Sequence, residues 1–164
     1  MPDHTSHLKD EGEHPLSHGG QKICLGLFLA VWVIDSFILH YSTFPSNYLP
    51  LSIRVLASGS IFAAAVLLLK SGHVVVSQEQ RPTNVVTGGA FRYVRHPIYL
   101  ACVLFYLALS IATASLASLC MVVGIFVFYN HIATYEEHLL EAKFGDRYKM
   151  YERRTGKWFP KVRT

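Results

Sequence analysis

The chain has 164 residues, of which 51% are hydrophobic and only 16% carry a charge, and its mean hydropathy is +0.29. Charged residues usually make up about 25% of a soluble domain, and a chain so poor in charge cannot cover its surface with them. The composition therefore argues against a soluble globule and against disorder. The net charge of +4 is too small to indicate a nucleic-acid partner. A small integral membrane protein of one domain is favoured.

The first 22 residues are polar, and they include four histidines, His4, His7, His14 and His18. A secretory signal places its apolar stretch close to the first residue and a small-residue cleavage site after it. Here the apolar stretch begins only at Ile23, and Phe44-Pro45 follows it. We therefore expect a polar tail over 1–22 and then a retained anchor. Histidine tracts can bind transition metals, but no fixed ligand spacing recurs, which favours a plain polar tail.

Two apolar stretches follow the tail. The first runs from Ile23 to Leu39 and is interrupted only by Asp35, and the second runs from about Leu51 to Leu69. Arg54, near the start of the second stretch, can extend its guanidinium to the membrane interface. We expect two anchoring transmembrane helices over 23–69.

A polar segment separates these anchors from a long charge-free stretch. No Asp, Glu, Lys or Arg occurs between Pro97 and Tyr135. A helix crosses a hydrocarbon core about 30 Å thick with roughly 20 residues, so this stretch is too long for one span. It predicts a helical hairpin that turns near residues 112–115. The chain is therefore expected to be all-α, with about four transmembrane helices, the last two forming the hairpin.

The three cysteines lie far apart, each within an apolar run: Cys24, Cys102 and Cys120. Their odd number and the lack of a CxxC pair argue against a disulfide framework and against a thiolate metal site. We interpret them as small buried hydrophobic residues.

The basic residues predict the orientation of the chain. Fourteen of the fifteen lysines and arginines lie in the tail, in the polar segment between spans two and three, or after span four, and only Arg54 lies on the other side. Cytoplasmic loops carry the excess of Lys and Arg in membrane proteins. Both termini and the middle segment are therefore expected in the cytoplasm.

The segment from Tyr135 to Arg154 has the pattern of an amphipathic helix. Its apolar residues recur at intervals of four, four and three and form one stripe: Leu140, Phe144, Tyr148 and Tyr151. Glu136 falls on this stripe and is expected to point inward, whereas Glu137 is rotated from it by about 100°. Gly145 is expected to interrupt or bend the helix. A helix lying on an anionic leaflet would explain the basic residues, but not an acid on the buried face.

Two polar clusters adjoin the charge-free hairpin. Residues 87–99 read TGGAFRYVRHPIY, in which Pro97 suits the first turn of a helix. His96 then lies at the helix N-terminus, where backbone N–H groups favour a carboxylate, and Tyr99 is within one turn. The two glycines allow a close approach of the backbone to a ligand. An ordinary basic and aromatic belt at the membrane interface is the alternative interpretation.

The second cluster is Tyr135-Glu136-Glu137-His138, at the end of the fourth span. A carboxylate at this place is costly unless it has a cationic partner, and the simplest alternative is an ion pair with Lys143 or Arg92. The two clusters bracket one hairpin, so they can meet in one pocket. A helix N-terminus for an anion and a carboxylate for a cation would suit a zwitterionic ligand.

These residues carry a resemblance to a known family. The stretch VVTGGAFRYVRHPIYL, the charge-free hairpin and YEEHLLEAKFGDRYKMYERR resemble the isoprenylcysteine carboxyl methyltransferase family and are similar to the related membrane phospholipid methyltransferases. The resemblance covers roughly Arg81 to Pro160. It implies a methyltransferase core over 70–164 that uses S-adenosyl-L-methionine, bound in a cytoplasmic pocket. The residues it implies for contacts with that cofactor are Thr83, Asn84, Val85, Val86, Phe91, His96, Pro97, Ile98, Tyr99 and Glu136.

One departure from the family concerns the methyl acceptor. The prenylcysteine enzymes carry an arginine about one turn before the glutamate, whereas this chain has Asn130-His131-Ile132-Ala133 there. The resemblance implies a lipophilic acceptor reached from the membrane lipids, with the carboxyl group of an isoprenylcysteine-like molecule first. Without the arginine, a phospholipid, a thiol or an amine is an alternative. Such acceptors need a base, for which His96, Glu137 and His131 are candidates, and His131 is also the candidate contact to the acceptor.

Two functions of other classes compete with the enzyme. One is a non-catalytic membrane module that binds haem or metal through histidines facing each other inside spans. His40, His73, His96 and His131 lie near span ends instead, so we predict no metal site. The other is a structural adaptor, which leaves both polar clusters unexplained.

Overall fold

A computed structural model describes residues 17–78 and 84–161. In these ranges the chain forms five α-helices: α1 (Ser17–Val33), α2 (Leu51–Gln78), α3 (Pro97–Thr113), α4 (Leu116–Phe144) and α5 (Asp146–Arg154). A π-helix, η1 (Ile34–Leu39), continues α1, and two 3₁₀-helices, η2 (Phe44–Asn47) and η3 (Gly89–Arg92), lie in the connections. The described residues contain no strand, only one bridge between Val94 and Gly156. The all-α prediction is confirmed.

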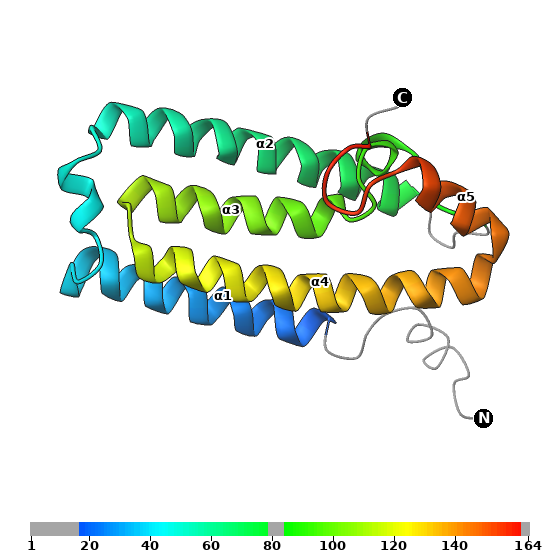
Figure 1. The fold of residues 1–164 in the computed structure, drawn as a ribbon, viewed down its shortest axis with the longest axis horizontal. Helices are drawn as coiled ribbons and strands as arrows, with labels where there is room; N and C mark the ends of the chain where they lie inside the picture. Colours follow the sequence, from blue (N-terminus) through cyan, green and yellow to red (C-terminus); the bar gives the residue numbers. More distant parts are fainter. Residues whose placement is uncertain (1–16, 79–83, 162–164) are drawn as a thin grey trace.

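The four long helices run side by side in an elongated bundle (Figure 1), with α2 along α3 and α1 along α4. The connection that holds η2 and the turn between α3 and α4 lie at one end of the bundle. The loop before α3, the end of α4 and α5 lie at the other end. The polar clusters singled out by the sequence therefore belong to one end of the molecule.

Within residues 17–78 and 84–161, three helical segments are long and apolar enough to cross a membrane: Gly19–Leu39, Leu51–Val74 and Leu116–Phe144. Helices suit this task because they satisfy their backbone hydrogen bonds internally. The fourth segment, α3, is apolar but has only 17 residues. The predicted count of four spans is thus not confirmed, and the second span is longer than the stretch to Leu69 that the sequence indicated.

The hairpin turn lies where the sequence predicts it. α3 ends at Thr113, Ala114 has a left-handed backbone with φ of 54°, and Ser115 precedes α4. The Ser115 hydroxyl accepts a hydrogen bond from the backbone N–H of Ser118 at 3.1 Å, which satisfies one of the free donors at the helix start. The sequence therefore specifies both the position of this turn and its capping group.

The predicted break at Gly145 is also confirmed, with a different consequence. Residues 135–144 continue α4 without interruption, and only Asp146–Arg154 form the separate helix α5. Gly145 has φ of 55°, a backbone conformation that favours glycine. The two glutamates accordingly belong to the last turns of the long helix α4.

The core lies between α1, α3, α4 and the C-terminal segment. Its buried members are Phe28, Val103, Tyr106, Val122, Ile125, Tyr129, Ala133 and Trp158. By contrast, α2 leaves many apolar side chains exposed, among them Leu51, Ile53, Val55, Leu56, Phe62, Leu67 and Leu69. A face this apolar is suited to contact lipid rather than water.

The end of the bundle opposite the glutamates is held by Asp35, the acid within the first apolar stretch. Asp35 is 6% exposed and accepts hydrogen bonds from the hydroxyls of Ser42 and Ser115, at 2.6 and 2.5 Å. Arg54 donates to the carbonyl of Ala112 at 3.1 Å. Because buried polar groups need partners, these bonds join the first two helices to the turn between α3 and α4.

Candidate functional site

The loop before α3 is fixed from both sides. The backbone N–H of Ala90 donates to the hydroxyl of Ser71 on α2, and that of Arg95 donates to the carbonyl of Gly156, each at 2.9 Å. Pro97 begins α3 and His96 precedes it at the N-cap, as the RHPIY motif predicts. Since the His96 side chain makes no capping bond, its imidazole is directed to α4 instead.

The end of α4 meets this helix start through its two carboxylates. His96 Nε2 lies 3.0 Å from Glu137 Oε1, and His96 Nδ1 lies 3.9 Å from Glu136 Oε2. Tyr99 donates its phenolic hydrogen to Glu136 Oε1 at 2.5 Å. The two clusters that bracket the hairpin in the sequence therefore form one cluster in space.

Glu137 lies beside two cationic side chains and the His96 imidazole. Its Oε1 lies 2.9 Å from Arg95 Nε, and its Oε2 lies 3.5 Å from Lys157 Nζ. Arg95 also reaches Glu152 Oε1 at 3.0 Å. The alternative interpretation, an ion pair with Lys143 or Arg92, does not describe Glu137: Arg95 and Lys157 are its partners, and the Lys143 ammonium lies over the Phe144 ring.

The burial of the two carboxylates also differs from the prediction. The Glu137 side chain is 13% exposed and that of Glu136 is 18% exposed, so both are largely buried. The apolar stripe predicted burial for Glu136 alone. A helical pattern cannot show that Glu137 has a cationic partner on a distant loop. Arg95 and Lys157 supply that partner, and a buried charge is tolerated when it is paired in this way.

Aromatic rings line the site beside Glu136. The Tyr99 ring is stacked on His96 with centroids 5.7 Å apart, and on Tyr129 with centroids 5.3 Å apart. The Trp158 ring lies 5.9 Å from His96. Aromatic faces next to a carboxylate attract cations. Tyr129 and Trp158 were not among the residues that the sequence indicated.

The segment after α5 turns back to close the site. Gly156 is buried, and a Cβ at this position would lie 1.8 Å from the carbonyl oxygen of Phe159, so only glycine fits the turn. Trp158 Nε1 donates to Asn130 Oδ1 at 2.9 Å, and Lys157 Nζ donates to Thr134 Oγ1 at 2.7 Å. In the sequence, this turn is signalled by Gly156, which directly precedes Lys157 and Trp158. Asn130, in the stretch that carries no arginine one turn before the glutamates, thus holds Trp158.

The segment 83–86, predicted to contact the cofactor, precedes the two glycines and lies apart from the glutamates. Asn84 Oδ1 accepts a hydrogen bond from Arg147 at 3.0 Å, and Val85 and Val86 are half-buried. The carbonyl of Phe91 accepts a hydrogen bond from Tyr151 Oη at 2.6 Å. Burial raises the pKa of Tyr151, so its phenol remains a donor. Thr83 lies outside the described residues.

The remaining predicted residues lie near the start of α3 or on α4. Pro97 is buried, and Ile98 lies against α2, where a Cβ on Gly72 would come within 2.9 Å of Ile98 Cγ1. His131 is exposed on α4. Three residues that the resemblance implies, His96, Tyr99 and Glu136, are thus brought together, and Glu137, a candidate base, joins them.

The chemistry of this cluster suits a ligand that carries both a positive and a negative group. It offers two carboxylates, stacked aromatic faces and the N-terminus of α3. Among residues 17–78 and 84–161, no three His, Cys, Asp or Glu side chains come together as metal ligands do.

Comparison with known proteins assigns the chain to a family. The model of the phospholipid methyltransferase family matches residues 56–147. The chain is 29% identical over 91 residues to protein-S-isoprenylcysteine O-methyltransferase of Schizosaccharomyces pombe, a match covering 55% of this chain and 39% of that protein. It is 33% identical over 86 residues to methanethiol S-methyltransferase 1 of Bradyrhizobium diazoefficiens, covering 52% of this chain and 30% of that protein.

The matches therefore span well under half the length of these curated relatives. The family match covers more than half of this chain and includes α3 with His96 and Tyr99 and the end of α4 with both glutamates. The sequence resemblance is confirmed: the chain belongs to the phospholipid methyltransferase family, whose members matched here are membrane methyltransferases.

Proposed function

We propose that the protein is an S-adenosylmethionine-dependent methyltransferase that acts on a lipophilic acceptor. The observation that carries this proposal is the cluster in which His96 and Tyr99 at the start of α3 contact Glu136 and Glu137 at the end of α4. The cluster lies inside the region that the family model matches. Both relatives are methyltransferases by name, which supports the same reaction type here.

Glu136 and Tyr99 are the groups proposed to hold the positive end of the donor. S-adenosylmethionine supplies a methyl group on a sulfonium, already activated for an in-line displacement. The protein therefore mainly has to orient donor and acceptor and exclude water. A carboxylate beside stacked rings attracts a sulfonium or an ammonium group. Tyr99, bonded to Glu136 Oε1 at 2.5 Å, sets the direction of that carboxylate.

Glu137 is proposed to position His96 rather than to act as a free base. Its carboxylate is shared between Arg95, Lys157 and His96 Nε2. A carboxylate that is hydrogen-bonded to one ring nitrogen fixes the orientation of the imidazole, as in other enzymes where histidine is a general base. The other nitrogen, Nδ1, faces Glu136 at 3.9 Å. His96 is therefore the better candidate for taking a proton from a thiol or amine acceptor.

The acceptor is proposed to be a small apolar molecule that arrives from the bilayer. One relative is named for a protein-bound isoprenylcysteine and the other for methanethiol, and both names include a sulfur atom that carries an apolar group. In this chain residues 130–133 contain no arginine that could hold an acceptor carboxylate, and Asn130 Oδ1 accepts a hydrogen bond from Trp158 at 2.9 Å. This favours an acceptor without a free carboxylate over a prenylcysteine. His131, exposed on the same helix, remains the proposed contact to it.

The site is proposed to face the cytoplasm. From residue 143 onward the sequence contains eight basic residues: Lys143, Arg147, Lys149, Arg153, Arg154, Lys157, Lys161 and Arg163. The excess of Lys and Arg marks the cytoplasmic side of membrane proteins. The donor would then enter from the cytoplasm and the acceptor from the surrounding lipids.

The test is calorimetric binding of S-adenosylhomocysteine to the purified full chain in detergent. We expect binding to the wild type and, for Glu136→Gln, an affinity at least about thirtyfold lower, because S-adenosylhomocysteine keeps the ammonium group that the Glu136 carboxylate is proposed to pair with. Glu141→Gln is the matched control, since Glu141 lies on the same helix but pairs with the half-exposed Lys149.

Helical circular dichroism and a monodisperse elution profile establish that each variant is folded. A folded wild type that binds no S-adenosylhomocysteine overturns the proposed activity. A Glu136→Gln variant that binds as tightly as the control overturns the assignment of the site.

A further inference from the structure

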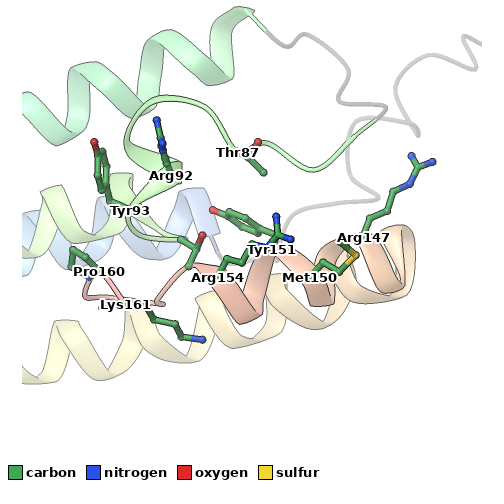
Figure 2. A pocket seen from close by; sticks show the side chains of 10 residues that line it. Thr87, Arg92, Tyr93, Arg147, Met150, Tyr151, Arg154, Pro160 and Lys161 are labelled. Carbon is green, nitrogen blue, oxygen red and sulfur yellow. The ribbon is translucent and has the colours of Figure 1, made fainter. Parts of the chain in front are cut away.

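The two ends of the bundle each have a pocket. The one between the loop before α3 and α5 has a volume of about 680 Å³, and Figure 2 shows Arg147 and Tyr151 among the residues that line it. These two side chains bond Asn84 and the carbonyl of Phe91, so this pocket adjoins the residues predicted for the donor. The other pocket lies at the opposite end, beside η2 and the turn between α3 and α4 (Figure 1).

The pocket beside η2 has a volume of about 480 Å³ and a largely polar lining. The side chains that matter for its chemistry come from η1, η2 and the first turn of α2: His40, Thr43, Ser46, Asn47 and Arg54. Among the described residues that line this pocket, Arg54 alone has a permanent charge. The pocket shares no residue with the proposed donor site, and the methyl transfer gives it no role.

The guanidinium of Arg54 is only partly satisfied by the protein. Its Nη1 donates to the carbonyl of Ala112 at 3.1 Å, whereas its Nε is shielded from solvent and has no hydrogen-bond partner within residues 17–78 and 84–161. A buried donor without a partner is costly, and such groups in native proteins nearly always have one. The Nε edge of a guanidinium presents two parallel N–H groups, which match the two oxygens of a carboxylate.

The charges around Arg54 favour a single negative charge beside it. Asp35, which precedes the pocket residue Ser36, is bound by Ser42 and Ser115 instead of Arg54. Arg54 itself lies in the first turn of α2, where the positive end of the helix dipole repels a cation and attracts an anion. One arginine among polar groups without a permanent charge balances a monoanion, and a multivalent anion would leave an excess of negative charge.

The rim of this pocket is apolar and exposed. Phe44 lines the pocket, and Tyr41, Tyr48 and Leu51 lie next to lining residues or at the start of α2; all four are exposed. Aromatic residues at the end of a membrane-spanning helix are typical of the membrane interface. An acyl chain attached to the anion would therefore find apolar surface beside Arg54.

We propose that the pocket beside η2 binds a carboxylate, which pairs with the Nε edge of Arg54 and accepts hydrogen bonds from the polar side chains of η1 and η2. The exposed apolar rim favours a fatty acid as the source of the carboxylate over a small free acid. The proposal goes beyond the methyl transfer, because this pocket and Glu136 lie at opposite ends of the bundle (Figure 1).

The test measures binding of hexanoate to the full chain in an uncharged detergent, by titration followed through the nuclear magnetic resonance signal of its labelled carboxyl carbon. Acetate, which lacks the acyl chain, and hexanamide, which lacks the charge, are parallel probes. For Arg54→Gln we expect an affinity for hexanoate at least about tenfold lower, because the charge-assisted hydrogen bonds are lost. Arg153→Gln is the matched control, since Arg153 is exposed at the other end of the molecule.

A second variant keeps the test decisive if circular dichroism shows that Arg54→Gln does not fold. The side chains of Ser46 and Asn47 line the pocket and make no hydrogen bond within the described residues, so Ser46→Ala/Asn47→Ala should leave the fold intact. We expect its affinity for hexanoate to fall by roughly threefold or more, because neutral donors to the carboxylate are removed.

The outcomes separate the alternatives. Hexanoate binding that is weakened in the pocket variants and kept in Arg153→Gln supports the proposal. Equally tight binding of acetate, weakened in the same variants, supports the carboxylate site and identifies a small acid as its source. The proposal is overturned if the wild type binds neither carboxylate, if hexanamide binds as tightly as hexanoate, or if the folded pocket variants bind hexanoate as tightly as the control.

Discussion

Glu136 and Glu137 are neighbours in the sequence but bind different partners. Glu136 accepts a hydrogen bond from Tyr99 on α3, whereas Glu137 contacts Arg95 on the loop and Lys157 beyond α5. The helical pattern of the sequence predicts which residues share a face. It contains no information on Lys157, which reaches Glu137 only because the chain turns back at Gly156. The importance of Glu136 was therefore predictable, and the ion-pair network of Glu137 was not.

At the scale of this residue, Glu137→Gln should destabilise the protein. The substitution leaves Arg95 and Lys157 without the carboxylate they share, and hydrogen bonds to charged groups contribute about 2 kcal/mol each. We expect the free energy of unfolding to fall by about 2 kcal/mol or more, measured by denaturant titration of helical circular dichroism in detergent.

The matched control at this scale is Glu141→Gln. Glu141 is 40% exposed and its partner Lys149 is 50% exposed, and exposed ion pairs contribute at most about 1 kcal/mol. Equal destabilisation by Glu137→Gln and Glu141→Gln would contradict the view that the network of Glu137 holds the loop, α4 and the C-terminal segment together.

At the scale of elements, the start of α3 depends on close packing against α2. Gly72 is buried where α2 passes Ile98, and an added Cβ would come within 2.9 Å of Ile98 Cγ1. Gly72→Ala should therefore lower the free energy of unfolding by about 1–3 kcal/mol, as overpacking does. Because Ile98 precedes Tyr99, the same change should also weaken binding of S-adenosylhomocysteine.

The control for this prediction lies on the same helix. A Cβ at Gly59 has no atom within 4 Å, so Gly59→Ala should leave stability unchanged or raise it by up to about 1 kcal/mol, as alanine favours helices over glycine. Thermal unfolding followed by circular dichroism measures both. A Gly72→Ala variant as stable as Gly59→Ala would show that α2 and α3 do not pack as described.

The sequence predicts the elements where local signals are strong. Pro97 starts a helix, the small residues near 112–115 turn the hairpin, and Gly145 ends α4. Other features depend on tertiary contacts and escape prediction. The amphipathic pattern over 135–154 does not show that residues 135–144 are the end of α4 and only 146–154 form α5. The 17 residues of α3 show that a charge-free run does not itself set a span length.

At the scale of the whole molecule, the bundle has two chemically different ends. One end carries α5 and the loop before α3, and the other carries η2 and the turn between α3 and α4 (Figure 1). The distribution of lysines and arginines predicts which end is cytoplasmic. This asymmetry was predictable from the sequence, whereas the fold of the residues around Gly156 was not.

The orientation has a direct test in a background in which the three cysteines are replaced by alanine. Tyr48, next to η2, is 83% exposed, and Phe159 is 77% exposed at the other end. A membrane-impermeant maleimide should label Tyr48→Cys in intact cells and Phe159→Cys only after permeabilisation. The opposite pattern, or labelling of both from outside, would contradict the proposed cytoplasmic site.

The central claim is methyl transfer to a lipophilic acceptor, and one measurement tests it most directly. The protein is reconstituted in vesicles with S-adenosylmethionine labelled in its methyl group, together with a membrane lipid extract and apolar thiols. Organic extracts are then analysed by mass spectrometry. The account predicts one species heavier by a single methyl group with the wild type and with Glu141→Gln, and none with Glu136→Gln. A folded wild type that labels no extractable molecule, or a Glu136→Gln variant that labels it equally fast, would contradict the account.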